Sequence, residues 1–177
     1  MYKKLQEAQE SSLWKKFYAV NGYIISLCGI AVTLVIFAGV IMRYVFKKDF
    51  FGSEEIILLF TWWLYFLGGI GASQENSHIS ADMVDVFCSN KVIVDMTKGI
   101  AKALEAIVFF LCTYMSVLLL ITNIQKWPVT TGLKIPYVAA QAPIVIGFFG
   151  MAVFAVYWSM FYISKALHDR KNGGEQK

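Results

Sequence analysis

Residues 17–42 read FYAVNGYIISLCGIAVTLVIFAGVIM, a stretch in which no side chain carries a charge. Three more charge-free stretches follow it along the chain. Each stretch is at least about the 18–20 residues that a helix needs to cross roughly 30 Å of hydrocarbon. A helix of a soluble protein would show a polar face every few residues, and these stretches do not. The sequence therefore predicts an all-α membrane protein with four transmembrane helices, near residues 20–42, 56–74, 106–125 and 138–162.

The overall composition agrees with a chain that lies mostly in a membrane. Of its 177 residues, 58% are hydrophobic and 16% are charged, against about 25% charged residues in an average soluble domain. The net charge of +4 is modest, and we expect no nucleic-acid partner. Cys28 and Cys112 fall inside predicted spans, and Cys88 forms no CxxC pair with either, so a disulfide framework is not expected. The first apolar stretch is too long for a signal-peptide core, and we expect it to remain as the first span.

Basic residues predict the orientation. Both termini and the middle loop share one side of the membrane, which holds eleven lysines and arginines against five on the other side. The positive-inside rule then places both termini in the cytoplasm. We expect an amphipathic interfacial arm over residues 1–19, a transmembrane domain over 20–163 and a cytoplasmic tail over 164–177.

The region 79–104, between the second and third spans, is amphipathic. Charged residues recur there and just beyond at helical spacings of four and three, which predicts one polar stripe on a helix. We expect a helix in the cytoplasmic interface or an extension of the third span, with the stripe as a solvated face. The stripe consists of Lys91, Asp95, Lys98, Lys102 and Glu105.

The predicted spans lack the residue types that several functions need, and these functions are therefore excluded. A haem-binding anchor needs histidine ligands within its spans, and His78 and His168 both lie outside them. A disulfide oxidoreductase needs reactive cysteine pairs, and a proton-coupled pump usually carries an ionisable group in mid-membrane. The predicted spans contain none of these, so we expect no enzyme, cofactor or metal.

Several interfacial residues are candidates for fixing a hairpin or meeting a partner chain. Arg43 ends the first span, and Glu54 and Glu55 open the second. Acidic residues in a first helical turn suit the helix dipole, which is the simpler interpretation. Adjacent carboxylates face different directions, however, so one of them could pair with Arg43 while the other faces a partner. His78 and Asp82 follow the second span in a polar turn that is most simply a solvated loop.

The second span carries a second kind of candidate, for helix packing. Gly68 and Ala72 form a small-xxx-small pair with Gly69 beside them, and such positions let helices approach closely in lipid. Trp62 and Trp63 lie inside the span rather than at its rim, which indicates a protein-facing surface.

The order of these motifs resembles a known family. The runs are Arg43-Tyr-Val-Phe46, Ser53-Glu-Glu55, Leu67-Gly-Gly69, His78-Ile-Ser-Ala-Asp82, Leu133-Lys-Ile-Pro136 and Ala142-Pro143-Ile. Together they resemble the small membrane subunit of the tripartite ATP-independent periplasmic (TRAP) transporters, the DctQ-like subunit, over nearly the whole chain. The chain departs from the family at Gly52, where a tryptophan is common, and at Gln74 and Glu75, near which a basic residue is common.

The resemblance implies a bacterial inner-membrane protein without enzymatic activity. Such a subunit would pair with a large membrane subunit that carries the solute and sodium sites, and a periplasmic binding protein would deliver an organic acid such as a sialic acid or a C4-dicarboxylate. The chain would act as a scaffold among membrane lipids and offer part of the outer docking surface. Charged residues of the outer loops would then face the binding protein: Lys47, Lys48, Asp49, Lys126 and Lys134.

Two alternatives belong to other classes. One is a membrane disulfide or quinone oxidoreductase, which the missing cysteine pairs and in-span ligands disfavour. The other is an autonomous small exporter acting as a homodimer, which would be expected to need a carboxylate within the membrane.

Overall fold

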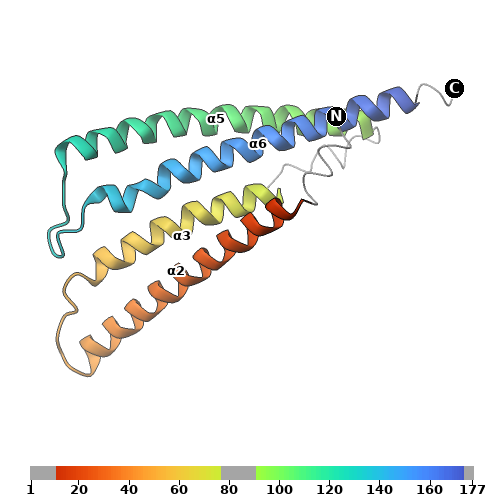
Figure 1. Cartoon of the computed structure of the whole chain (residues 1–177). Coiled ribbons are helices and arrows are strands. Elements are labelled where there is room, and N and C mark those ends of the chain that lie inside the picture. The colour runs from red at the N-terminus through yellow and green to blue at the C-terminus, as the bar shows by residue number, and fades with distance from the viewer. Residues whose placement is uncertain (1–10, 77–90, 174–177) are drawn as a thin grey trace.

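Four long helices make up the computed structural model, which describes residues 11–76 and 91–173 (Figure 1). All four are long and apolar enough to cross a membrane, which confirms the predicted fold class. Each predicted span lies within one helix. The candidates His78 and Asp82, most of the N-terminal arm and the end of the tail lie outside the described residues. The helices are α2 (Ser12–Tyr44), α3 (Ser53–Glu75), α5 (Lys91–Lys126) and α6 (Tyr137–Gly173).

Local signals set several helix ends. The side chain of Ser11 caps α2 by accepting a hydrogen bond from the backbone N–H of Trp14, at 3.3 Å. Helix α3 begins after Gly52, whose φ of 80° is a left-handed conformation that glycine adopts easily. The same helix ends at Asn76, also left-handed, and the backbone N–H of Asn76 bonds to carbonyl oxygens of the last turn.

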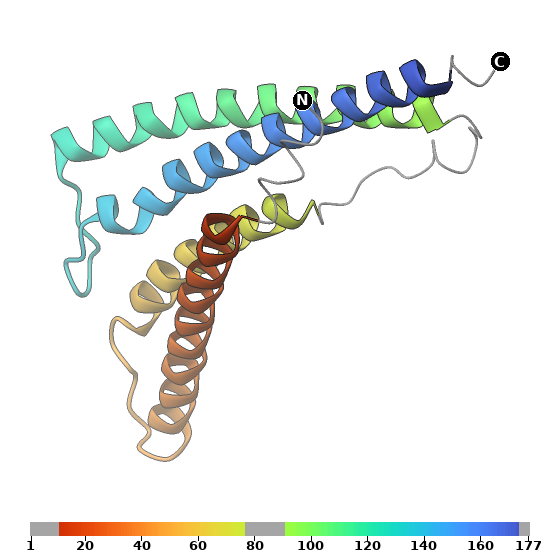
Figure 2. The same ribbon diagram turned by 45° about the vertical axis from the view of Figure 1, so that its right-hand side comes forward.

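The helices form an open layer rather than a closed bundle. Helix α3 packs against α2 on one side and α6 on the other, and α5 packs only against α6. The order across the layer is therefore α2, α3, α6, α5, as Figure 1 shows. Figure 2 shows that α2 leans away from the other three toward the end where the loops lie. Helices α2 and α5 are the two edges, and each leaves a long apolar face uncovered.

The centre of the layer is the contact between α3 and α6. Leu67, Ile70 and Met151 form the buried core cluster, with aromatic rings packed around it. Glycines let the two backbones approach: a Cβ added at Gly147 would lie 2.6 Å from Phe66, and one at Gly150 would lie 2.9 Å from Ile70. Helix α3 is thus fixed to α6 by the close approach of their backbones.

Two members of the polar stripe of residues 91–105 are buried instead of solvated, and for these two residues the prediction was wrong. Helix α5 begins at Lys91 and runs without a break into the third span, so this part of the stripe belongs to a helical extension of the span. Asp95 and Lys102 are both buried, while the apolar residues Ile93, Met96 and Ile100 are exposed. The interpretation as a solvated face assumed water around the helix, whereas here Lys165 of α6 pairs with Asp95, and Glu105 of α5 itself pairs with Lys102.

The helices differ in length. Helix α3 has 23 residues and is about 35 Å long at roughly 1.5 Å per residue, close to the thickness of a bilayer. Helix α5 has 36 residues and is about 54 Å long by the same rise. The additional length of α5 and α6 lies at the end of the layer where α2 begins and α6 ends (Figure 1).

Candidate functional site

The two described loops that join helices meet at one end of the layer, which we call the loop end. Residues 45–52 connect α2 to α3, and residues 127–136 connect α5 to α6. The second loop is a compact turn: the backbone N–H of Thr130 donates to the carbonyl oxygen of Ile135 at 2.9 Å, and Val129 and Pro136 form a short bridge. Two segments distant in the sequence thus lie side by side at the loop end (Figure 1).

Glu55 joins the two loops. Its carboxylate accepts hydrogen bonds from the Thr130 hydroxyl at 2.6 Å, the Gly132 N–H at 2.7 Å and the Leu133 N–H at 2.8 Å. Hydrogen bonds to an ionised group are roughly twice as strong as neutral ones. We call this arrangement the Glu55 clasp. Because Glu55 belongs to the first turn of α3, the clasp fixes the α5–α6 loop to the start of α3.

Two glycines make room for the clasp. A Cβ at Gly52 would lie 2.6 Å from the Leu133 side chain, and a Cβ at Gly132 would lie 2.9 Å from a carboxylate oxygen of Glu55. Gly52 also has a positive φ, so a side chain there would be strained as well as crowded. The departure from the family pattern at Gly52 is therefore part of how this chain joins its two loops.

Arg43 and Glu54 take other positions. The ion pair of Arg43 is with Asp49, at 3.8 Å, rather than with either glutamate as hypothesised. Glu55 is turned toward the α5–α6 loop, and Glu54 beside it is exposed. The expectation that the adjacent carboxylates face different directions therefore agrees with the geometry, but their partners differ from those considered.

All five candidate docking residues are exposed at the loop end. Lys47, Lys48 and Asp49 come from the α2–α3 loop, Lys126 is the last residue of α5, and Lys134 lies in the α5–α6 loop. Large apolar side chains are exposed among them, including Phe46, Phe51 and Trp127. The loop end thus presents lysines interspersed with aromatic groups, and the Glu55 clasp fixes the relative position of its two halves.

The candidates for helix packing divide into two groups. Trp63 donates from its indole N–H to the carbonyl oxygen of Ala139 on α6 at 3.2 Å, and a Cβ at Gly69 would lie 2.9 Å from the sulfur of Met151. Trp62 stacks on Phe66 of its own helix, and Ala72 is half-buried in the last turns of α3. Gly68 is on another face, because a Cβ there would have no heavy atom within 4 Å. One residue along a helix is a rotation of about 100°, which separates Gly68 from Gly69.

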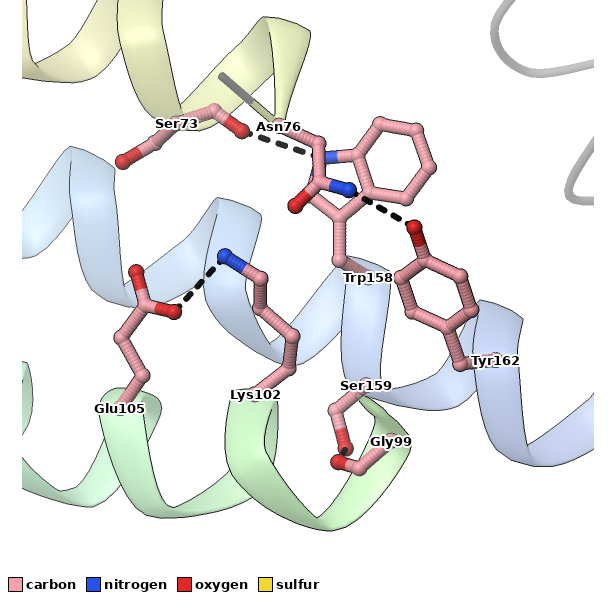
Figure 3. Close-up of polar contacts among 8 residues, drawn as sticks. All are labelled: Ser73, Asn76, Gly99, Lys102, Glu105, Trp158, Ser159 and Tyr162. Carbon is pink, nitrogen blue, oxygen red and sulfur yellow. Dashed lines mark hydrogen bonds and ion pairs between the residues drawn. The ribbon is translucent and has the colours of Figure 1, made fainter. Parts of the chain in front are cut away.

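A polar cluster at the opposite end joins three helices, and the sequence did not reveal it. Trp158 of α6 donates its indole N–H to the carbonyl oxygen of Ser73 on α3 at 3.0 Å, and Ser159 donates its hydroxyl to the carbonyl oxygen of Gly99 on α5 at 2.9 Å (Figure 3). Nearby, Lys102 of α5 forms a 2.7 Å ion pair with Glu105.

A further interhelical ion pair lies in the same part of the layer, where the Lys165 ammonium of α6 lies 3.0 Å from the buried Asp95 carboxylate of α5. Asp95, which interrupts an apolar helix face, was the signal in the sequence, but its partner Lys165 lies 70 residues away.

Another polar contact fixes α2 to α3. The Asn21 side chain is buried and donates to the carbonyl oxygen of Leu67 at 3.0 Å. Asn21 is one of the few strongly polar residues in the first charge-free stretch, and that isolation is a signal that could have identified it as an interhelical contact.

The described residues contain no group of three or more histidine, cysteine, aspartate or glutamate side chains placed to hold a metal ion. Their main features are two loops held together at one end of the layer, a polar interhelical cluster at the other, and apolar helix faces between them.

These features define the chain as a multi-pass helical membrane protein built for contact with other molecules. Residues 32–161 match the family model of the tripartite ATP-independent periplasmic transporters, DctQ component. The chain belongs to this family, and it is therefore the small membrane component of a TRAP transporter and not an enzyme. No curated protein matches the chain, and no solved structure matches it.

Proposed function

We propose that the chain is a scaffold subunit that anchors and braces a large membrane subunit, which itself carries the solute and coupling-ion sites. The observation that carries the proposal is the open layer, whose edge helices α2 and α5 expose apolar faces along their lengths. In water such faces would be an aggregation hazard. In a membrane they are surfaces for a second subunit and for lipid.

The spans also lack the groups that transport requires. No Asp, Glu, Lys, Arg or His lies in residues 17–42, 56–74, 106–125 or 135–164. Among the described residues, the buried charges are Asp95 and Lys102, which are near one end of the layer and are engaged in ion pairs. A carrier of charged solutes needs polar or charged groups near mid-membrane, so we assign those groups to the large subunit.

The loop end is the proposed docking surface for a periplasmic binding protein. Its exposed lysines Lys47, Lys48, Lys126 and Lys134 belong to two loops that the Glu55 clasp holds together. Charges at the rim of an interface mainly raise the association rate and make it depend on salt. This assignment places the loop end outside the inner membrane and both termini in the cytoplasm, in line with the positive-inside bias. An alkaline phosphatase fusion that is active at the C-terminus would contradict that orientation.

The solute is expected to be an organic acid, such as a sialic acid or a C4-dicarboxylate, taken up with sodium. These expectations rest on the family. The binding protein encoded with this chain is the direct source of the solute's identity, and calorimetry with that protein against both acid classes tests the assignment. Binding of neither class would contradict it.

A charge-reversal experiment tests the docking surface. The complex of this chain with its large subunit would be immobilised, and the association rate of the binding protein measured at low and high salt. We expect Lys47→Glu/Lys48→Glu to lower the rate about tenfold at low salt and less at high salt. The matched control is Lys15→Glu/Lys16→Glu, an equally exposed lysine pair at the opposite end of α2. Equal effects of the two double variants would refute the assignment.

An exporter that acts alone is the second candidate, and stoichiometry distinguishes it from a scaffold. Native mass spectrometry of the chain expressed with the large membrane protein encoded beside it should show a one-to-one complex. A stable homodimer that excludes the large protein would instead support the exporter.

A further inference from the structure

A wedge-shaped cavity opens between α2 and α3 near the loop end. The helices converge toward the start of α2 and separate toward the α2–α3 loop, as Figure 1 and Figure 2 show. The cavity between them has a volume of about 690 Å³ and is open at one side. That volume is within the roughly 300–1,000 Å³ typical of ligand pockets.

The polarity of the wedge walls changes along both helices in the same direction. On α2 the lining residues run from Val35 and Ile36 to Arg43, over about 12 Å of helix at roughly 1.5 Å per residue. On α3 they run from Ile57 to Glu54. The charged residues lie toward the α2–α3 loop, together with the aromatic residues Phe50 and Phe51, and the residues deeper along the spans are apolar. A phospholipid has the same order, with a charged headgroup at the interface and acyl chains toward the centre of the bilayer.

The charges at the mouth have both signs. The Arg43 guanidinium lies 3.8 Å from Asp49, and both side chains are largely exposed, at 74% and 89%. Glu54 is exposed at the same mouth, while the Glu55 carboxylate is engaged by the clasp. One cation and two available anions suit a headgroup that has both a phosphate and an ammonium group. A headgroup without an ammonium group would offer no hydrogen-bond donor of that kind to the two carboxylates.

A glycine keeps the middle of the wedge open. Gly39 lines the cavity, and a Cβ there would have no heavy atom within 4 Å. In the described chain the space above Gly39 is therefore vacant, and a larger side chain at this position would project into it without first displacing protein atoms.

From this geometry we propose that the wedge binds one phospholipid with a primary-ammonium headgroup, a phosphatidylethanolamine. Arg43 contacts its phosphate, Asp49 and Glu54 accept hydrogen bonds from its ammonium group, and an acyl chain lies over Gly39 between the two helices. The bound lipid fills the separation between α2 and α3 and holds α2 at its angle to the layer.

Native mass spectrometry of the purified full chain tests the proposal, with phosphatidylethanolamine and phosphatidylglycerol as probes. The wild-type chain should retain one phosphatidylethanolamine with a dissociation constant at least tenfold below that for phosphatidylglycerol. Gly39→Leu should weaken phosphatidylethanolamine binding at least tenfold. The matched control is Gly22→Leu on the same helix, where a Cβ also meets nothing within 4 Å but which lies outside the wedge. Equal lipid retention by the two leucine variants would overturn the proposal.

Headgroup recognition has its own variants, all at exposed positions that leave the helix contacts intact. Asp49→Asn/Glu54→Gln should remove the preference for phosphatidylethanolamine over phosphatidylglycerol, and Arg43→Gln should weaken binding of both lipids. An unchanged preference in the double variant would contradict the assigned contacts.

A photocrosslinking residue distinguishes a lipid from a protein occupant. Val40 lines the wedge, so Val40→p-benzoylphenylalanine in native membranes should form an adduct with the mass of a phospholipid. An adduct with the large subunit instead would show that protein fills the wedge and would overturn the proposal.

Discussion

Among single residues, Glu55 has the most consequential contacts. It accepts hydrogen bonds from residues 75, 77 and 78 positions further along the chain. The sequence showed a pair of acids in a first helical turn, where the helix dipole is a sufficient explanation. It could not show which acid faces the second loop, because that depends on the α3–α6 packing that brings residues 130–133 beside Glu55.

The Glu55 clasp predicts a large difference between two adjacent glutamates. Glu55→Gln should lower the free energy of unfolding by about 2–4 kcal/mol, because it weakens three hydrogen bonds to an ionised acceptor and places an amide N–H opposite a backbone donor. Thermal unfolding in detergent, followed by tryptophan fluorescence, measures the loss. Glu54→Gln is the control and should change stability by less than about 0.5 kcal/mol, as for most exposed sites. Similar losses for both variants would contradict the clasp.

A pair of glycines tests the close approach of α3 and α6. Gly147→Leu should cost about 1–3 kcal/mol because the new side chain overlaps Phe66. Gly68→Leu on the facing helix should be nearly neutral in the isolated chain, since it projects into open space. Denaturant titration in detergent would compare them, and a greater loss at Gly68 would be inconsistent with the described packing.

At the scale of helices, the sequence predicted which segments cross the membrane but not how they are ordered. Charge-free stretches are a direct consequence of the cost of burying charge in hydrocarbon, so their number and approximate positions could be read from residues 17–164. The order α2, α3, α6, α5 could not, because a helix surrounded by lipid has no polar face to show which side meets protein. The stripe around Asp95 was wrongly predicted to be solvated for a related reason, because Asp95 faces Lys165 of α6.

The ion pair between Asp95 and Lys165 predicts an asymmetric mutational response. Lys165→Met should destabilise the contact of α5 with α6 by about 1–3 kcal/mol, because it leaves the buried Asp95 carboxylate without its ammonium partner. Adding Asp95→Asn should recover part of that loss. Lys126→Met, an exposed lysine at the other end of α5, is the control. Purely additive losses in the double variant, measured by thermal unfolding, would show that the pair is not coupled.

For the whole molecule, the open layer is the observation that supports the proposed role of the chain as a scaffold. A closed four-helix bundle would bury its apolar faces internally. Here α3 and α6 form the packed centre, while α2 and α5 leave apolar faces available to a large subunit and to lipid. Contacts at the two ends hold the layer together, through the Glu55 clasp at one and the interhelical contacts of Trp158, Ser159 and Lys165 at the other.

The family of the chain was accessible from the sequence because the order of its motifs pointed to it, and the comparison then confirmed that family. The candidate site was accessible only in part. The lysines of the loop end could be listed from the sequence, whereas the clasp that positions them and the wedge beside them required the three-dimensional arrangement.

Solute uptake by reconstituted liposomes is the most direct measurement of the central claim. Vesicles would contain this chain alone, the large subunit alone or both, with solute-loaded binding protein outside and an imposed sodium gradient. The account predicts that this chain alone accumulates no solute and that uptake requires the large subunit, with full activity when both are present. Accumulation of solute against its gradient by vesicles that contain only this chain would contradict the account.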